Sequence, residues 1–172
     1  MRTRLLGLLA LLCLLIVGCG YHTPDSASEW AGGEARLLYV ELFENKTAQP
    51  YLEGYVTDAV TFELAKSRLL EITEQPQRAE VKLVGDVTDF SSRALAHGVD
   101  DRIVEYRAQM TIVARLVAVS DNQVLWQHSL TRNEDYPATE DKNLQLEAEA
   151  LVAKRVARRL AEDLYASLLT GF

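Results

Sequence analysis

Few residues in this chain have side chains suited to catalysis or metal binding. There are two cysteines, Cys13 and Cys19, and three histidines, His22, His97 and His128. The histidines are too far apart to give the short ligand spacing of a metal site. The sequence also has no Gly-x-Ser-x-Gly motif and no glycine-rich phosphate loop. We therefore expect no catalytic residue, no cofactor and no metal, so that the chain is not an enzyme.

The N-terminus has the composition of an export signal. Two of the first four residues are arginines, and an apolar run follows from residue 5 to residue 17. A membrane-spanning helix needs about 20 apolar residues, so this run is too short to remain as a span. A basic head with a short apolar core is typical of a signal peptide.

The cysteine at the end of this run provides a site for lipid attachment. The segment Ile16-Val17-Gly18-Cys19 resembles a lipobox, with isoleucine where leucine is usual. The thiol can form a thioether with diacylglycerol, and the small residues before it leave the peptide bond open to a peptidase. We therefore predict a lipoprotein signal peptide over residues 1–18 and lipidation of Cys19. Three acyl chains, palmitate among them, would anchor the chain stably, which one chain cannot do.

The residues after Cys19 indicate where the protein is anchored. An aspartate at the next position often retains a lipoprotein in the inner membrane, and this chain has Gly20 there. We therefore expect the outer membrane, with the protein on its periplasmic side. Residues 19–34 contain glycine, proline and serine without periodicity, which predicts a lipidated N-terminus and a flexible tether.

Composition limits the remaining functions. Removal of residues 1–18, which hold two arginines and no acidic residue, changes the net charge from −7 to −9. Such an acidic chain is a poor nucleic-acid binder. With Cys13 removed and Cys19 lipidated, no thiol is left for a disulfide or a nucleophile. Residues 35–172 have the length of a single domain.

Hydrophobic periodicity within residues 35–172 predicts an α+β fold. The expected order is β-α-β-β-β-β-α, with two helices packed on one face of a mixed four- to five-stranded sheet. The predicted segments are a strand at 36–43, a turn at 44–47, a helix opened by Pro50 over 51–66, strands at 68–74 and 79–90, a polar loop at 91–101, a strand at 103–119, a turn at 121–122, a strand at 124–134 and a helix at 144–169. The first strand, helix and second strand suggest a parallel crossover, and the later strands a meander. The uncovered face must be polar or meet a partner.

The same periodicity assigns side chains to the core. We expect Phe62 to widen the buried face of the first helix, and Leu144 and Leu151 to line that of the last. His128 is expected to be half-buried in a strand. A basic cluster on the outer face of the last helix is expected to be solvated and balanced by glutamates; its members are Arg155, Arg158 and Arg159, with Glu147, Glu149 and Glu162.

Several short motifs, in order, resemble the LPS-assembly lipoprotein family LptE. Cys19-Gly20-Tyr21-His22 is similar to the opening of that family's mature chains. The segment from Phe43 to Thr47, followed by Pro50, resembles a Phe-x-Asn-x-Thr pattern after the first strand. The strand with Glu105-Tyr106, the turn at Asp121 and the C-terminal helix match the remaining layout. The resemblance covers nearly the whole mature chain.

The resemblance implies a non-enzymatic role as partner of a β-barrel. It implies that the chain complexes with and plugs the barrel LptD, supports its assembly and helps to deliver lipopolysaccharide to the outer leaflet. A wide barrel has a polar lumen that a polar-surfaced domain can fill. Because lipopolysaccharide is anionic, we hypothesise that Arg102 and Lys142 contact it; Arg93 and Arg102 flank the predicted loop.

A different adaptor role is the alternative. Lipoproteins that activate peptidoglycan synthases or build secretion pores also have a strand, an Asn-x-Thr turn and a helix. They carry a longer tether or extra membrane-inserting hairpins. The tether predicted here, of about 15 residues, spans at most about 50 Å, which keeps the domain near its membrane and favours the barrel partner.

Overall fold

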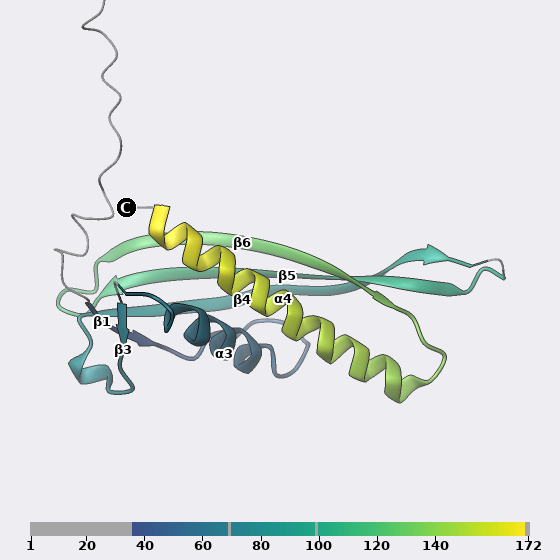
Figure 1. Cartoon of the computed structure of the whole chain (residues 1–172), viewed down its shortest axis with the longest axis horizontal. Helices are drawn as coiled ribbons and strands as arrows, with labels where there is room; N and C mark the ends of the chain where they lie inside the picture. The colour runs from purple at the N-terminus through teal and green to yellow at the C-terminus, as the bar shows by residue number, and fades with distance from the viewer. Residues whose placement is uncertain (1–35, 69, 99, 171–172) are drawn as a thin grey trace, which may run out of the picture.

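The computed structural model describes residues 36–170 apart from residues 69 and 99 (Figure 1). The predicted signal peptide, Cys19 and the tether lie outside the described residues. No helix in the described part of the chain is long and apolar enough to cross a membrane.

The architecture is the predicted α+β fold, with two helices on one side of a single mixed sheet (Figure 1). The elements in chain order are β1 (Arg36–Val40), β2 (Glu44–Asn45), α3 (Leu52–Leu64), β3 (Leu70–Ile72), a 3-10 helix (Pro76–Arg78), β4 (Val81–His97), β5 (Ile103–Ala118), β6 (Val124–Pro137) and α4 (Lys142–Thr170). The sheet has six strands rather than four or five, because β2 forms a separate short strand.

The strand order is β3-β1-β4-β5-β6, with β2 beside β4. Strand β1 is parallel to both β3 and β4, so α3 connects two parallel neighbours as the crossover prediction requires. Strands β4, β5 and β6 form the predicted antiparallel meander. Strand β6 is the last in this order, and its outer edge has no strand partner among the described residues.

The core lies between the sheet and the helices. Along β5 every second side chain is buried toward α3 and α4, as strand periodicity dictates. The buried set on this strand is Ala108, Met110, Ile112, Ala114 and Leu116. Val156, Leu160 and Leu164 of α4 close the core from the helix side and are fully buried.

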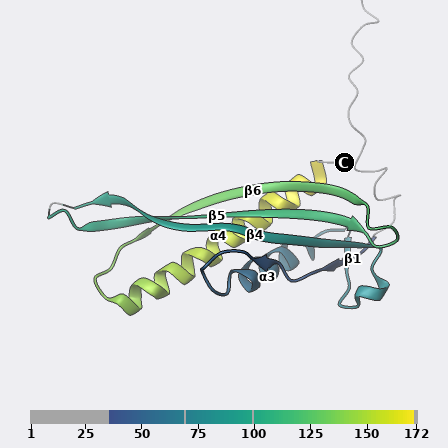
Figure 2. The ribbon, with the colours of Figure 1, turned by 180° about the vertical axis from the view of Figure 1, so that it is seen from behind.

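Strand β4 continues where a loop was predicted over residues 91–101. It runs to His97 and pairs with β5 as far as Ile103, so the loop prediction was wrong for residues 91–97. Polar side chains there are compatible with a strand because β5 satisfies the backbone hydrogen bonds. We call this paired segment, residues 91–97 and 103–107, the distal ribbon. It extends beyond both helices (Figure 1), as the view from behind also shows (Figure 2).

The first strand ends earlier than predicted, at Val40, and a second short strand starts at Glu44. Between them the chain carries Phe43 into the core, where the side chain is 1 % exposed. Its ring lies against Gly85 of β4, and a Cβ placed on that glycine would come within 2.2 Å of the ring. The interruption therefore lets an aromatic ring pack directly on the backbone of β4.

Helix α3 starts at Leu52. The prediction that Pro50 lies in its first turn was therefore wrong. Tyr51 is the N-cap in a left-handed conformation, with φ 69°. The buried face of α3 is also narrower than predicted, because only Leu52, Val56, Val60 and Leu64 are buried. Phe62, expected in the core, is 67 % exposed.

Helix α4 buries its middle and end but not its first turns. Leu144 and Leu151, predicted to face inward, are 54 % and 58 % exposed. Val152 and Ala153, which follow Leu151, are buried, so Leu151 lies on the side of the helix that faces away from the core. His128, predicted to be half-buried, is exposed on β6, and its ring stacks on Trp126 with centroids 5.8 Å apart.

Candidate interaction surfaces

The side of the sheet opposite the helices, called here the open face, is polar. It carries mainly hydroxyl, amide and charged side chains from three strands: Lys82, Val84 and Asp86 of β4, Gln109, Thr111, Val113 and Arg115 of β5, and Gln127, Ser129, Thr131 and Asn133 of β6. The hydroxyls of Thr111 and Thr131 lie 2.9 Å apart across β5 and β6. A sheet face with this composition remains stable in water or against a polar wall.

The charges on the open face are tied together near β2. The carboxylate of Asp86 is 10 % exposed and accepts ion pairs from Lys46 at 3.0 Å and Arg115 at 3.2 Å. The hydrogen bond to Asp86 raises the pKa of Lys46 despite the opposing desolvation. The nearly buried carboxylate of Asp86 is thus compensated by two cations of the open face.

Further along the open face, Arg107 and Asp135 form a two-point pair between β5 and β6. The Arg107 Nε and Nη2 donate to the two carboxylate oxygens of Asp135 at 2.7 and 2.9 Å. This bidentate contact raises the pKa of Arg107 and lowers that of Asp135. The pair fixes the register of β6 at the base of the distal ribbon.

The predicted ligand residue Arg102 lies at the tip of the distal ribbon. Its guanidinium pairs with Asp100 at 3.3 Å and with Glu140, which belongs to the segment before α4. These residues line a hollow of about 470 Å³ together with Ile103, Val104 and Tyr106. Arg102 therefore contacts Glu140, which precedes Lys142 by two residues in the sequence. Arg102 and Lys142 themselves do not form an ion pair or hydrogen bond.

The two predicted ligand residues differ in whether their charges are already paired within the described chain. Arg102 faces two carboxylates, so an anion would have to compete with both of them. Lys142 is the first residue of α4, is exposed, and has no ion-pair or hydrogen-bond partner for its side chain among the described residues. Arg93 is likewise exposed and unpaired within the described chain, but it lies on the β4 strand rather than in a loop.

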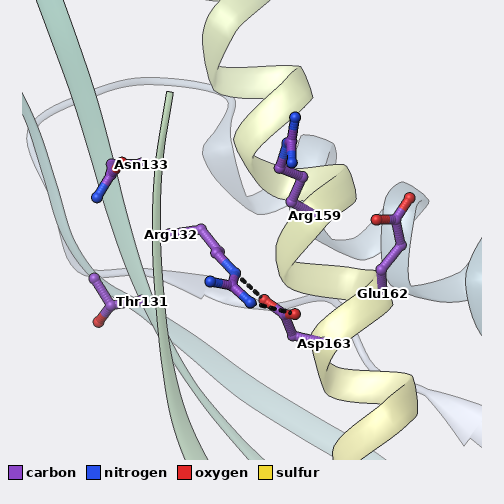
Figure 3. Close-up of a pocket in the computed structure, with 6 residues that line it drawn as sticks. All are labelled: Thr131, Arg132, Asn133, Arg159, Glu162 and Asp163. Atoms are coloured by element: carbon purple, nitrogen blue, oxygen red, sulfur yellow. Dashed lines mark hydrogen bonds and ion pairs between the residues drawn. The ribbon is translucent and has the colours of Figure 1, made fainter. Parts of the chain in front are cut away.

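A second hollow, of about 280 Å³, lies between β6 and α4 (Figure 3). Arg132 points from β6 toward α4 and donates to both carboxylate oxygens of Asp163, while Thr131 and Asn133 point the other way (Figure 3). Arg159 of α4 pairs with Glu134 of β6. The hollow is thus closed by paired charges, which makes it a helix–sheet contact rather than an open ligand site.

The basic cluster of α4 is outward-facing as predicted, but its partners differ from those expected. Arg159 pairs with Glu134 and not with the glutamates of its own helix. Arg155 and Arg158 are exposed and make no ion pair within the described chain. No group of three or more His, Cys, Asp or Glu side chains that could hold a metal occurs in the described ranges.

Similarity to known protein families identifies the family of this chain. A family model described as LptE, lipopolysaccharide-assembly, matches residues 35–168. The chain belongs to the LptE family. Among curated proteins, no match to the sequence is found.

Solved structures share the LptE-like fold at low sequence identity. A protein of Xanthomonas campestris has a TM-score of 0.58 and 18 % identity, over 80 % of this chain and 86 % of its own. A protein of Chlamydia trachomatis has a TM-score of 0.56 and 9 % identity, over 78 % and 96 %. Rare lipoprotein B of Shewanella oneidensis has a TM-score of 0.50 and 10 % identity, over 77 % and 92 %. At these identities the likeness concerns the fold alone.

The Phe-x-Asn-x-Thr segment that resembles LptE has a structural role in this chain. The Asn45 amide donates to the Gln49 carbonyl at 2.7 Å and to Glu53 at 2.9 Å. Its Oδ1 accepts from the backbone N–H and the hydroxyl of Thr47 at 3.0 and 2.8 Å. One side chain therefore closes the turn that leads from β2 into α3.

Proposed function

We propose that this LptE-family chain is a non-enzymatic outer-membrane lipoprotein, anchored through Cys19 on the periplasmic side, that plugs an LptD β-barrel. In this role it supports assembly of the barrel and delivery of lipopolysaccharide to the outer leaflet. Membership of a lipopolysaccharide-assembly family supports the general role. The observation that carries the specific role is the polar open face, which spans three strands and has the composition that suits a polar barrel wall.

Site-directed photo-crosslinking in outer membranes tests the contact directly. A photo-reactive residue at Gln109 or Asn133, at the end of the open face next to the distal ribbon, should yield a crosslink to a large β-barrel protein. The matched control is position Arg155, which is exposed on α4 on the helix side of the sheet and does not line the groove between the helices. Crosslinking from Arg155 alone, or recovery of a peptidoglycan synthase instead of a barrel, would contradict the plug.

We also propose that Arg102 and Lys142 contact the anionic groups of lipopolysaccharide during this delivery. Lys142 is available for such a contact, whereas Arg102 would exchange a carboxylate partner for a phosphate. The double reversal Arg102→Glu with Lys142→Glu should weaken lipopolysaccharide binding in vitro, and Arg155→Glu should not. Unchanged binding by the double variant would rule this contact out while leaving the crosslinking result intact.

A further inference from the structure

A groove between the two helices has no role in the proposed barrel contact. It has a volume of about 630 Å³ and is lined by Tyr55, Asp58, Ala59 and Phe62 of α3 and by Lys154 and Arg158 of α4. These helices cover the side of the sheet opposite the open face. We call this hollow the helix groove. Its size is within the range of ordinary ligand pockets.

The walls of the helix groove are aromatic and its rim is cationic. Phe62 is 67 % exposed and lines this hollow together with Tyr55. The Lys154 ammonium lies 4.9 Å from the centre of the Tyr55 ring, and the Lys66 ammonium 4.7 Å from that of Phe62. Each ring therefore has one ammonium near its face, Lys154 at Tyr55 and Lys66 at Phe62.

The charges at the rim remain available for a partner. Arg158 makes no ion pair or hydrogen bond through its side chain with any described residue. Among the described residues, the Lys154 ammonium interacts with the Tyr55 ring alone, and an ammonium over a ring keeps N–H donors for an acceptor. Asp58, the one carboxylate in the lining, is also without an ion pair in the described chain.

We propose that the helix groove binds an acidic segment of a partner protein. An apolar side chain of that segment would lie between Tyr55 and Phe62, and its carboxylates would meet Lys154 and Arg158. Asp58 would accept a backbone N–H, a donor that every peptide provides. A peptide matches this mixture of apolar, cationic and acceptor groups better than a bilayer surface, which is flat and cannot fill a hollow between helices.

Binding of a labelled acidic peptide to the detergent-solubilised full-length chain tests the proposal. The probe carries glutamates on both sides of a central phenylalanine, and a control peptide carries glutamines in their place. We expect the acidic peptide to bind, with affinity that falls as salt is added. The variant Lys154→Gln with Arg158→Gln should weaken it at least tenfold, and Phe62→Ser at least fivefold.

The matched control is Arg155→Gln, because Arg155 is exposed on the same helix but does not line the groove. It should change the affinity less than twofold. Equal binding of the glutamine peptide, equal weakening by Arg155→Gln, or no binding of the acidic peptide would overturn the proposal. So would binding of phosphatidylglycerol vesicles through Phe62 and Lys154 in place of the peptide. The barrel crosslinks from the open face are a separate measurement, so the two proposals can fail independently.

Discussion

At the scale of single residues, the side chain of Asn45 stabilises the turn between β2 and α3. It makes four hydrogen bonds that join β2, the following turn and the first turn of α3. We predict that Asn45→Ala lowers the free energy of unfolding by about 1–3 kcal/mol, because several polar groups lose their partner at once.

Urea denaturation measures this loss. The variant Asn45→Asp keeps both acceptor contacts to Thr47 but brings a carboxylate oxygen against the Gln49 carbonyl and the Glu53 carboxylate, so its stability should also fall well below that of the wild type. A stability for Asn45→Ala equal to that of the wild type would show that the turn forms without this side chain.

The Phe43 ring packs directly on Gly85 and leaves no room for a side chain at that position. Because a Cβ at this position would come within 2.2 Å of the Phe43 ring, Gly85→Ala must displace a fully buried side chain. We expect a loss of about 1–3 kcal/mol in unfolding free energy, the usual range for overpacking. Combining it with Phe43→Leu should cost less than the sum of the single changes, whereas strict additivity in thermal or urea unfolding would argue against the contact.

Tyr136 gives the molecule a sensitivity to alkaline pH. Burial raises the pKa of its phenol above the ordinary 10.0, and the hydrogen bond with Ser92 opposes this only in part. A raised pKa in the fold means that the neutral phenol is favoured there. Its contribution to stability is complete below pH 10 and is lost as the pH rises through the folded pKa.

The prediction is that Tyr136→Phe removes part of the alkaline destabilisation above pH 10. Unfolding free energies measured from pH 8 to 11 should fall less steeply in this variant than in the wild type. Tyr51→Phe, at a side chain that is 67 % exposed, serves as the control and should leave the slope unchanged.

At the scale of elements, α4 is held over β6 by paired charges as well as by its leucines. Arg132 of β6 and Asp163 of α4 form a bidentate ion pair between these two elements. The hydrogen bond to Asp163 raises the pKa of Arg132. Reversing either charge, Arg132→Asp or Asp163→Arg, should lower stability only modestly, since solvent screens this partly exposed pair.

Combining the two reversals restores opposite charges and should recover most of that loss. A double-mutant cycle by chemical denaturation measures the coupling. The variant Arg155→Asp changes a charge on the same helix that has no ion-pair partner in the described chain, and it should be nearly neutral. Absence of recovery in the double reversal would mean that the contact does not hold the helix.

The order of elements could be predicted from the sequence, but several boundaries could not. Period-2 alternation over residues 103–119 identified β5 because one face of that strand is buried. Residues 91–97 lack this signal, since none of them is fully buried and neither face carries a regular apolar row, so sequence alone did not identify their pairing with β5. In the same way Leu151 and Phe62 have helical spacing, but nothing in their own sequence tells whether a neighbouring element covers them.

The candidate sites were predicted less completely than the fold. The charges of Arg102 and Lys142 suggested them as ligand residues, but nothing in the sequence indicated that Glu140 would pair with Arg102. It also gave no sign of the helix groove, because Tyr55 and Lys154 are almost 100 residues apart and meet only when α3 and α4 pack. Contacts of this kind arise from tertiary packing and have no local pattern.

At the scale of the whole molecule, the proposed role depends on attachment through Cys19. We predict that Cys19→Ser abolishes incorporation of labelled palmitate and releases the protein from the membrane fraction. Because the domain from residue 36 onward is unaffected by this change, the purified variant should unfold at the same temperature as the wild type. Continued labelling of Cys19→Ser would place the acyl chains elsewhere.

The outer edge of β6, which is paired with no other described strand, has a consequence for how the molecule behaves before it finds its partner. Along this strand the pairing with β5 runs without a register shift from Glu105 to Leu116, so the outer edge is regular as well. A regular strand edge without a neighbour can recruit another strand and start aggregation. The cell should therefore keep newly exported copies scarce or escorted, and overproduction without a partner should yield aggregates before it yields soluble monomer.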